Sequence, residues 1–328
     1  MSVLSGLYAA GVAARNALYD RGTLPARRLR KPVISVGNVA VGGAGKTPFV
    51  MLLAELLARR GLRCDVLTRG YGRASRGVAV VDVAGSAQQF GDEPLLIARR
   101  LKVPVIVGED RYAAGLEAEK QFDSDLHLLD DGFQHRALAR DFDIVLVTPD
   151  DARDRVLPAG RLREPLSALA RADAVVLAAG AEPEPFPLAG RRVWRARRGI
   201  IPPRGAPQHP VVFCGIARPQ NFLLQLRKAG VEPAAEASFR DHNRYSERDV
   251  RDLLQLREKS EADGFMTTEK DAVNLGALAA QLEPMCVVPL RMTLENAEAA
   301  LDEMLRVIGE RVRTFNTQDT KKHKGVSP

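Results

Sequence analysis

The stretch that most constrains the fold of this chain is VISVGNVAVGGAGKTP, residues 33–48. An apolar, β-branched run leads into a glycine-dense turn that closes on a lysine and a threonine. This order predicts a buried strand, a phosphate-binding loop and the start of a helix. The predicted nucleotide-binding residues are Gly42, Gly43, Ala44, Gly45, Lys46, Thr47 and Pro48.

Each residue type in this loop has a chemical reason. The glycines allow backbone conformations that a Cβ forbids, so successive N–H groups can approach a polyphosphate. Lys46 then reaches the outer phosphates, Thr47 ligates Mg²⁺, and Pro48 suits the first turn of a helix whose dipole favours an anion. Ala40 departs from the common pattern, which has glycine there. A glycine-rich turn with a chance lysine is the alternative interpretation.

Composition narrows the class of protein. The 328 residues suffice for two domains, and 45% hydrophobic with 27% charged residues indicates a soluble globular chain. No run approaches the 18 apolar residues of a membrane span. Three widely spaced cysteines predict reduced thiols in a cytosolic protein. The net charge of +7 is concentrated at the chain ends and aromatic residues make up 5%, which argues against a nucleic-acid groove.

Residues 1–31 form a predicted N-terminal segment with an amphipathic helix and a basic stretch. On a helical wheel one side carries Val3, Leu4, Leu7, Gly11, Ala14 and Leu18. The basic residues that follow are Arg21, Arg27, Arg28, Arg30 and Lys31. This arrangement is typical of a segment lying on an anionic membrane surface. A helix packed on the protein's own core beside a solvated basic loop explains the same residues equally well.

Residues 32–185 alternate between buried strands and helices, which predicts the P-loop domain. The fold class is α/β: a mostly parallel sheet of the P-loop NTPase type with helices on both faces. RGYGR at residues 69–73 follows a strand at the edge where ligands bind in parallel sheets. GDEP at residues 91–94 opens a helix, where Asp92 and Glu93 are also ordinary N-terminal acids.

A second strong motif is DLHLLDDGFQHR, residues 125–136. An apolar strand that runs into Asp130 and Asp131 is the Walker B pattern, in which a carboxylate at the strand's end holds Mg²⁺. Adjacent carboxylates repel unless a cation lies beside them. We therefore predict Thr47, Asp130 and Asp131 as the metal site. The alternative is a solvent-exposed turn.

Three further segments complete the expected organisation. Residues 186–208, rich in proline, glycine and arginine, are the predicted linker, and residues 209–312 are a smaller C-terminal α/β domain. Residues 313–328 are predicted to be a disordered basic tail. FRDHNRYS at residues 239–246 is a polar cluster between elements, where His242 alone does not justify a catalytic role.

Taken together, the motifs resemble those of the tetraacyldisaccharide 4'-kinase family of bacterial lipid A synthesis. They are, in chain order, VGNVAVGGAGKTP, TRGYGR, GDEP, DLHLLDDGFQHR, GRLREP, GIARP, RDHNRYS and TTEKDAV. The resemblance runs from about residue 1 to residue 305.

This resemblance implies transfer of the ATP γ-phosphate, with Mg²⁺, to the 4'-hydroxyl of a tetraacyl glucosamine disaccharide 1-phosphate, giving lipid IVA. The implied location is peripheral, on the cytoplasmic face of the bacterial inner membrane. Carried over by motif, Asp92 is the base, His242 is brought from the second domain to orient it, and Lys46 holds phosphate. Further implied site residues are Arg69, Tyr71, Glu93, Arg111, Gln134, His135, Arg163 and Glu164.

Two rival functions remain at this stage. One is a P-loop kinase for another small acceptor, and the other is a nucleotide-dependent switch in which GDEP and DDGFQH are switch segments. The absence of an NKxD motif tilts the nucleotide toward ATP rather than GTP.

Overall fold

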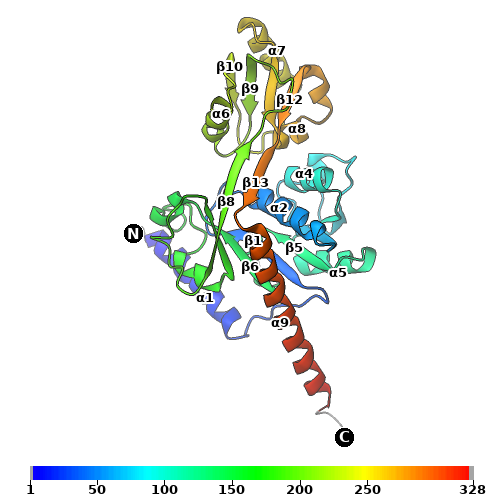
Figure 1. Ribbon diagram of the computed structural model, residues 1–328, viewed down its shortest axis with the longest axis vertical. Helices are drawn as coiled ribbons and strands as arrows, with labels where there is room; N and C mark the ends of the chain where they lie inside the picture. Colours follow the sequence, from blue (N-terminus) through cyan, green and yellow to red (C-terminus); the bar gives the residue numbers. More distant parts are fainter. Residues whose placement is uncertain (1–2, 325–328) are drawn as a thin grey trace. The chain divides into compact units, whose positions relative to one another are not determined.

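The computed structural model describes residues 3–324 of the chain, with side chains through residue 314. The chain divides into two compact units. Unit 1 comprises the described parts of residues 1–69, 103–197 and 293–328, and unit 2 comprises residues 70–102 and 198–292. Each unit is built around a parallel sheet of its own (Figure 1).

The central strands of unit 1 are β1 (Val33–Asn38), β2 (Cys64–Thr68), β4 (Val105–Val107), β5 (Leu126–Asp130), β6 (Phe142–Leu146), β7 (Ala174–Ala178) and β8 (Arg192–Ile200), whose last three residues belong to unit 2. They are adjacent in the order β8-β7-β6-β1-β5-β2-β4, and every pairing is parallel. Every residue of β1, β2, β4, β5 and β6 is buried, as expected for parallel strands covered on both faces. The predicted fold class is confirmed.

Helices and two 3₁₀ turns surround this sheet. They are α1 (Val3–Asp20), α2 (Lys46–Arg59), α5 (Arg111–Gln121), η1 (Pro149–Arg153), η2 (Leu166–Arg171) and α9 (Ala297–Lys324). Helix α2 packs on β1, β5 and α9, and α9 also packs on β6 (Figure 1). Helix α5 packs on β2 and β4. No helix in residues 3–324 is long and apolar enough to cross a membrane.

Unit 2 contains a four-stranded parallel sheet in the order β10 (Ala235–Ser238), β9 (Pro210–Cys214), β11 (Gly264–Thr268) and β12 (Met285–Val288). Its helices are α3 (Ala87–Phe90), α4 (Asp92–Leu101), α6 (Pro219–Lys228), α7 (Glu247–Lys259), α8 (Glu269–Leu275) and the 3₁₀ turn η3 (Gly276–Leu282). The two-residue strand β3 (Ala79–Val80) also belongs to it, and β13 (Leu290–Leu294) runs from unit 2 into unit 1. Phe213 and Phe265 pack edge to face in its core.

The division into units differs from the contiguous domains predicted from the sequence. Residues 70–102, assigned to the P-loop domain, belong to unit 2. The reason is that α4 packs against α8, and Arg100 forms an ion pair of 2.9 Å with Glu269. An apolar helix face shows that a helix is buried, but it does not show which sheet covers it.

The predicted linker and tail are also corrected. The linker at residues 186–208 contains strand β8, in which Trp194 and Ala196 alternate with more exposed residues and are buried. The tail predicted from residue 313 continues as helix α9 to Lys324, because no proline or glycine interrupts the chain between Gly309 and Gly325. Residues 325–328 lie outside the described part of the chain.

Candidate active site

The first group of site residues lies where β1 and β5 end. Val36 of β1 pairs with Asp130 of β5, so the residues that follow these two strands lie side by side. The phosphate loop leaves β1 and enters α2 at Lys46. Gly42 (φ +113°) and Gly45 (φ +87°) have positive φ, which explains the glycines at these two positions.

Lys46 is held at the mouth of the phosphate loop. Its Nζ lies 3.3 Å from Oδ1 of Asn38 and 3.5 Å from Oδ1 of Asp131. Asn38 is buried at the end of β1, and Arg163 also donates to its side-chain oxygen. Asn38 was not predicted as a site residue, although a polar residue at the end of a mostly apolar strand, just before the glycine turn, is a signal that could have found it.

Thr47 and Asp130 form the pair expected of a magnesium site. Thr47 Oγ1 lies 3.5 Å from Asp130 Oδ2, and both residues are buried. One hydroxyl and one carboxylate fit Mg²⁺, which takes few protein ligands and completes its octahedron with phosphate oxygens and water. Within the described residues, no cluster of three or more His, Cys, Asp or Glu side chains forms a complete protein cage for a metal.

Asp131 contacts cations of the protein. Its carboxylate forms a bidentate pair with Arg163, at 2.8 and 3.0 Å, in addition to the contact with Lys46. Partial burial opposes its ionisation, but Lys46 and Arg163 outweigh that effect and hold the pKa of Asp131 far below its ordinary value. Asp131 is therefore a charged partner for Lys46 and Arg163, and the metal role predicted for it stays a prediction.

The other predicted residues of unit 1 surround these groups. Gln134 donates to the backbone oxygen of Asn38 at 2.9 Å. Arg111 is buried, and burial together with the nearby charge of Arg69 lowers its pKa from the ordinary value. Burial and the Arg111 charge lower the pKa of His135 to about 4, so its imidazole is neutral at pH 7.

The second group of site residues lies in unit 2, around Asp92. This residue begins α4, and its Oδ1 accepts a hydrogen bond of 2.9 Å from the N–H of Glu93. Its Oδ2 lies 2.8 Å from Nδ1 of His242, 3.2 Å from Nδ2 of Asn274 and 3.8 Å from Nζ of Lys270. Asp92 is only 5% exposed. The carboxylate is therefore surrounded by donors inside one unit.

The pKa values of Asp92 and His242 are shifted in opposite directions. Burial opposes ionisation of Asp92, but His242, Lys270 and Asn274 outweigh it and hold the pKa of Asp92 below its ordinary value. The hydrogen bond to Asp92 outweighs partial burial and raises the pKa of His242. Each group thus stabilises the charged form of the other, as in a hydrogen-bonded ion pair.

The backbone holds His242 in an unusual conformation. Its φ is +58°, in the left-handed region, and its N–H donates to the Gly215 carbonyl at 3.2 Å. The ring of Tyr71 lies 5.4 Å from the imidazole. A non-glycine residue held at positive φ is a feature that concentrates at functional sites.

The buried carboxylate of Asp271 supports the backbone next to His242. Asp271 accepts hydrogen bonds from the Gly215 N–H (2.7 Å), from the Tyr245 hydroxyl (2.8 Å) and from Thr268. It is fully buried, and burial raises its pKa although the donors oppose that effect. Asp271, Lys270 and Asn274 were not predicted as site residues; the TTEKDAV motif contains Lys270 and Asp271, and Asn274 directly follows it.

The structure corrects the predicted origin of the Asp92–His242 pair. We expected one partner from each domain, but both residues belong to unit 2. The pairing at 2.8 Å therefore forms within one compact unit. No closure of one domain on another is needed to assemble it.

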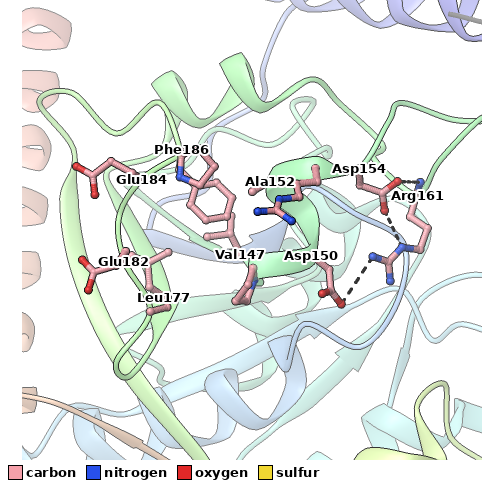
Figure 2. Close-up of a pocket in the computed structure, with 13 residues that line it drawn as sticks. Val147, Asp150, Ala152, Asp154, Arg161, Leu177, Glu182, Glu184 and Phe186 are labelled. Carbon is pink, nitrogen blue, oxygen red and sulfur yellow. Dashed lines mark hydrogen bonds and ion pairs between the residues drawn. The ribbon is translucent and has the colours of Figure 1, made fainter.

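A separate pocket of about 810 Å³ lies in unit 1 beyond the ends of β6 and β7. Val147, Leu177 and Phe186 form part of its wall, and Arg161 is ion-paired with Asp154 at its rim (Figure 2). None of the predicted site residues is among those that line it.

Comparison with known proteins identifies close relatives. The family model described as tetraacyldisaccharide-1-P 4'-kinase, LpxK, matches residues 1–308. The tetraacyldisaccharide 4'-kinase of Koribacter versatilis is 52% identical over 320 residues, which cover 95% of this chain and 99% of that protein. The protein of the same name from Geobacter metallireducens is 40% identical, covering 93% of this chain and 97% of the relative.

A solved structure agrees with the sequence comparison. The crystal structure of LpxK from Aquifex aeolicus in complex with ATP matches with a TM-score of 0.77 and 36% sequence identity. The match covers 93% of this chain and 97% of that one.

Proposed function

The chain belongs to the tetraacyldisaccharide-1-P 4'-kinase family, and we propose that the residues described above carry out its phosphoryl transfer. The activity is that of an ATP-dependent kinase of lipid A biosynthesis. The proposed acceptor is the 4'-hydroxyl of a tetraacyl glucosamine disaccharide 1-phosphate. The single observation that carries the assignment of residues is the buried Asp92–His242 contact of 2.8 Å. A nucleotide switch, which phosphorylates nothing, has no use for such a pair.

The proposed roles in unit 1 concern the nucleotide. The loop from Gly42 to Thr47 cradles the phosphates, and Lys46 neutralises charge that develops on the transferred group. Thr47 and Asp130 would hold Mg²⁺, which would neutralise part of the phosphate charge when bound. Arg163 is oriented by its bidentate contact with Asp131 and supplies a second cation.

The proposed role in unit 2 concerns the proton. As the acceptor oxygen forms its bond to the γ-phosphorus, the bond from that phosphorus to the β–γ bridging oxygen breaks and ADP leaves. The hydroxyl proton passes to Asp92, whose carboxylate is kept ionised by His242, Lys270 and Asn274. His242 holds the carboxylate in place and shares the proton, so the two residues titrate as a pair.

The exposed face of α1 supports a membrane surface as partner. Val3, Leu4 and Leu7 are 80%, 64% and 66% exposed, and Leu18 is 40% exposed. The face that contacts the protein carries smaller or polar residues, among them Ser5, Ala9 and Asn16, and Asn16 bonds to Glu164. A helix packed on the protein's own core would show the reverse arrangement. We propose that this apolar face lies in the interface of the membrane that carries the acylated substrate, on the cytoplasmic side where ATP is available.

The basic segment contributes less to this attraction than its sequence indicates. Arg27, Arg28 and Arg30 each form an ion pair with an acidic residue of unit 1, at 2.6, 2.6 and 3.1 Å. Charges paired within the protein attract an anionic surface less. Burial of the apolar side chains of α1 is thus the main contribution to the proposed membrane binding.

Transfer of labelled γ-phosphate tests the proposal. The purified chain is incubated with Mg²⁺, labelled ATP and a tetraacyl disaccharide 1-phosphate in mixed micelles, and the lipid is separated and counted. Labelled lipid is expected from the wild type, and Asp92→Asn is expected to label it far more slowly. Release of labelled inorganic phosphate with no labelled lipid from the wild type would overturn the assignment.

A further inference from the structure

Helix α1 contacts the two loops that carry charged site residues of unit 1. We call residues 131–136 the aspartate loop and residues 158–164 the arginine loop. Arg163 of the arginine loop and Asp131 of the aspartate loop form the bidentate pair at 2.8 and 3.0 Å. These two loops therefore meet at the side chains that face the phosphate loop.

Three side chains of α1 bond to the arginine loop. Tyr8 Oη donates to the Arg163 carbonyl at 3.2 Å, and Asn16 Nδ2 donates to Glu164 Oε2 at 2.7 Å. Ser5 is buried and accepts a hydrogen bond of 3.2 Å from the N–H of Ala159. The helix thus contacts both ends of the arginine loop.

The aspartate loop is bonded to the same face of the helix. Arg15 donates to the Gln134 carbonyl at 2.9 Å, and Arg136 donates to the Asn16 carbonyl at 2.9 Å and to Asp20 at 2.6 Å. One helix face therefore holds both loops, while its opposite face presents the exposed apolar side chains.

Glu164 connects α1 to the part of the arginine loop that lies beside Asp131. It is only 3% exposed, and it accepts from Asn16 on one side and from Arg171 on the other, at 2.9 and 3.0 Å. Glu164 directly follows Arg163 in the chain, so the contact with Asn16 lies one residue from the guanidinium that pairs with Asp131.

We propose that α1 is a positioning element of the active site, so that docking of its apolar face on a lipid surface sets the geometry of Arg163 and Asp131. Asn16 is the positioning residue that connects the two. This inference rests on the proposed function, because it assigns the lipid surface that α1 meets to regulation of the same phosphoryl-transfer site.

Thermodynamic linkage makes the effect reciprocal. If a lipid surface stabilises the position of α1 in which Arg163 is correctly placed, Mg-nucleotide binding must raise the affinity for that surface by the same factor, typically about 5–150-fold in coupled systems. A helix that served only as an anchor would bind vesicles equally well with or without nucleotide.

The test compares Asn16→Ala with the wild type and with Ala13→Ser, an exposed change on the same helix. Vesicles of phosphatidylethanolamine and phosphatidylglycerol are sedimented with each protein, with and without Mg²⁺ and a non-hydrolysable ATP analogue. The wild type and Ala13→Ser are expected to bind more tightly with nucleotide, and Asn16→Ala to lose that dependence while it still binds vesicles. Its kcat for the lipid acceptor is expected to fall by roughly 10²-fold, as a displacement of about 1 Å costs, with KM for the acceptor unchanged.

Exchanging the side-chain groups of Asn16 and Glu164 distinguishes a positioning role from a general loss of structure. Asn16→Asp places two carboxylates together and is expected to be at least as impaired as Asn16→Ala. Combining Asn16→Asp with Glu164→Gln puts the carboxylate on α1 and the amide on the arginine loop. The hydrogen bond can then form with donor and acceptor exchanged, and kcat is expected to recover in part. Wild-type kcat and wild-type nucleotide dependence in Asn16→Ala would overturn the inference, whereas a wild type that transfers no phosphate would overturn the proposed function instead.

Discussion

Asp92→Asn is the most direct perturbation of the proposed chemistry. Asparagine has nearly the same shape, and its oxygen still accepts from His242 and Asn274. Asparagine cannot take up the proton of the acceptor hydroxyl. Its amide NH₂ also faces the Glu93 N–H, which in the wild type donates to the carboxylate. The change thus removes the base and one local hydrogen bond while the surrounding packing stays.

The expected loss of activity follows from the role of a positioned base. Such a base typically contributes about 10²–10⁴ in rate, which is about 3–5 kcal/mol at 1.36 kcal/mol for each factor of ten. His242→Asn should cost a similar factor, and asparagine is chosen because it tolerates the positive φ of this position, where alanine would add strain. If the two residues act as a unit, the double variant loses little more than either single one.

Stability supplies an independent measure with a defined pH dependence. The lowered pKa of Asp92 gives stabilisation that is complete above its ordinary value of 3.8 and is lost as the pH falls through the folded value. The raised pKa of His242 gives stabilisation that is complete below 6.5 and is lost as the pH rises through the folded value. The pair therefore stabilises unit 2 fully between about pH 4 and 6.5, where a hydrogen bond between charged groups is worth about 1.5–3 kcal/mol.

The assay combines both readouts on the same variants. Phosphate transfer to the lipid acceptor gives kcat, and amide hydrogen exchange of β9 and β11 across pH 4–8 gives the free energy of opening of unit 2. The Asp92→Asn deficit in stability should shrink as the pH rises above 6.5. Fully additive kinetic losses in the double variant, or a stability deficit that grows with pH, would refute the paired role.

Three further outcomes are expected. Lys270→Gln should move the acidic limb of the kcat/KM profile to higher pH, because the Lys270 charge lowers the pKa of Asp92; a profile that does not move, or moves to lower pH, would contradict this. Tyr245→Phe removes one donor to the buried Asp271 and should lower the free energy of opening of unit 2 by about 1.5–3 kcal/mol, measured by hydrogen exchange at β9. Lys46→Met should slow single-turnover transfer by about 10²–10³-fold, the usual cost of one preorganised donor, and a near-normal rate would remove Lys46 from the mechanism.

The phosphate-loop group could be predicted because its signals are local. A strand, a glycine-bearing turn and a helix start follow one another in the chain, and parallel pairing of β1 with β5 then brings Thr47 to Asp130 without further information. Asn38 was not predicted, because a single polar residue before a glycine turn has no spacing that distinguishes it from an ordinary turn residue.

The site in unit 2 could not be predicted from periodicity. The Asp92–His242 contact joins residues 150 positions apart, and Asn274 contacts Asp92 across 182 positions. Family resemblance indicated the first pair, but no pattern in the sequence shows that α4 packs on α8. The support of the His242 turn by Asp271 depends on the same long-range packing.

The division of the chain into discontinuous units has a consequence for biosynthesis. The chain passes between the units after residues 69, 102, 197 and 292, so no single cut releases either unit whole. Asp92 leaves the ribosome 150 residues before His242, an interval of roughly 8–30 s at 5–20 residues per second. Helix α8, on which α4 packs, and strands β11 and β12 of unit 2 are complete only at residue 288, and a nascent chain that stops short of residue 242 carries a phosphate loop but no finished base.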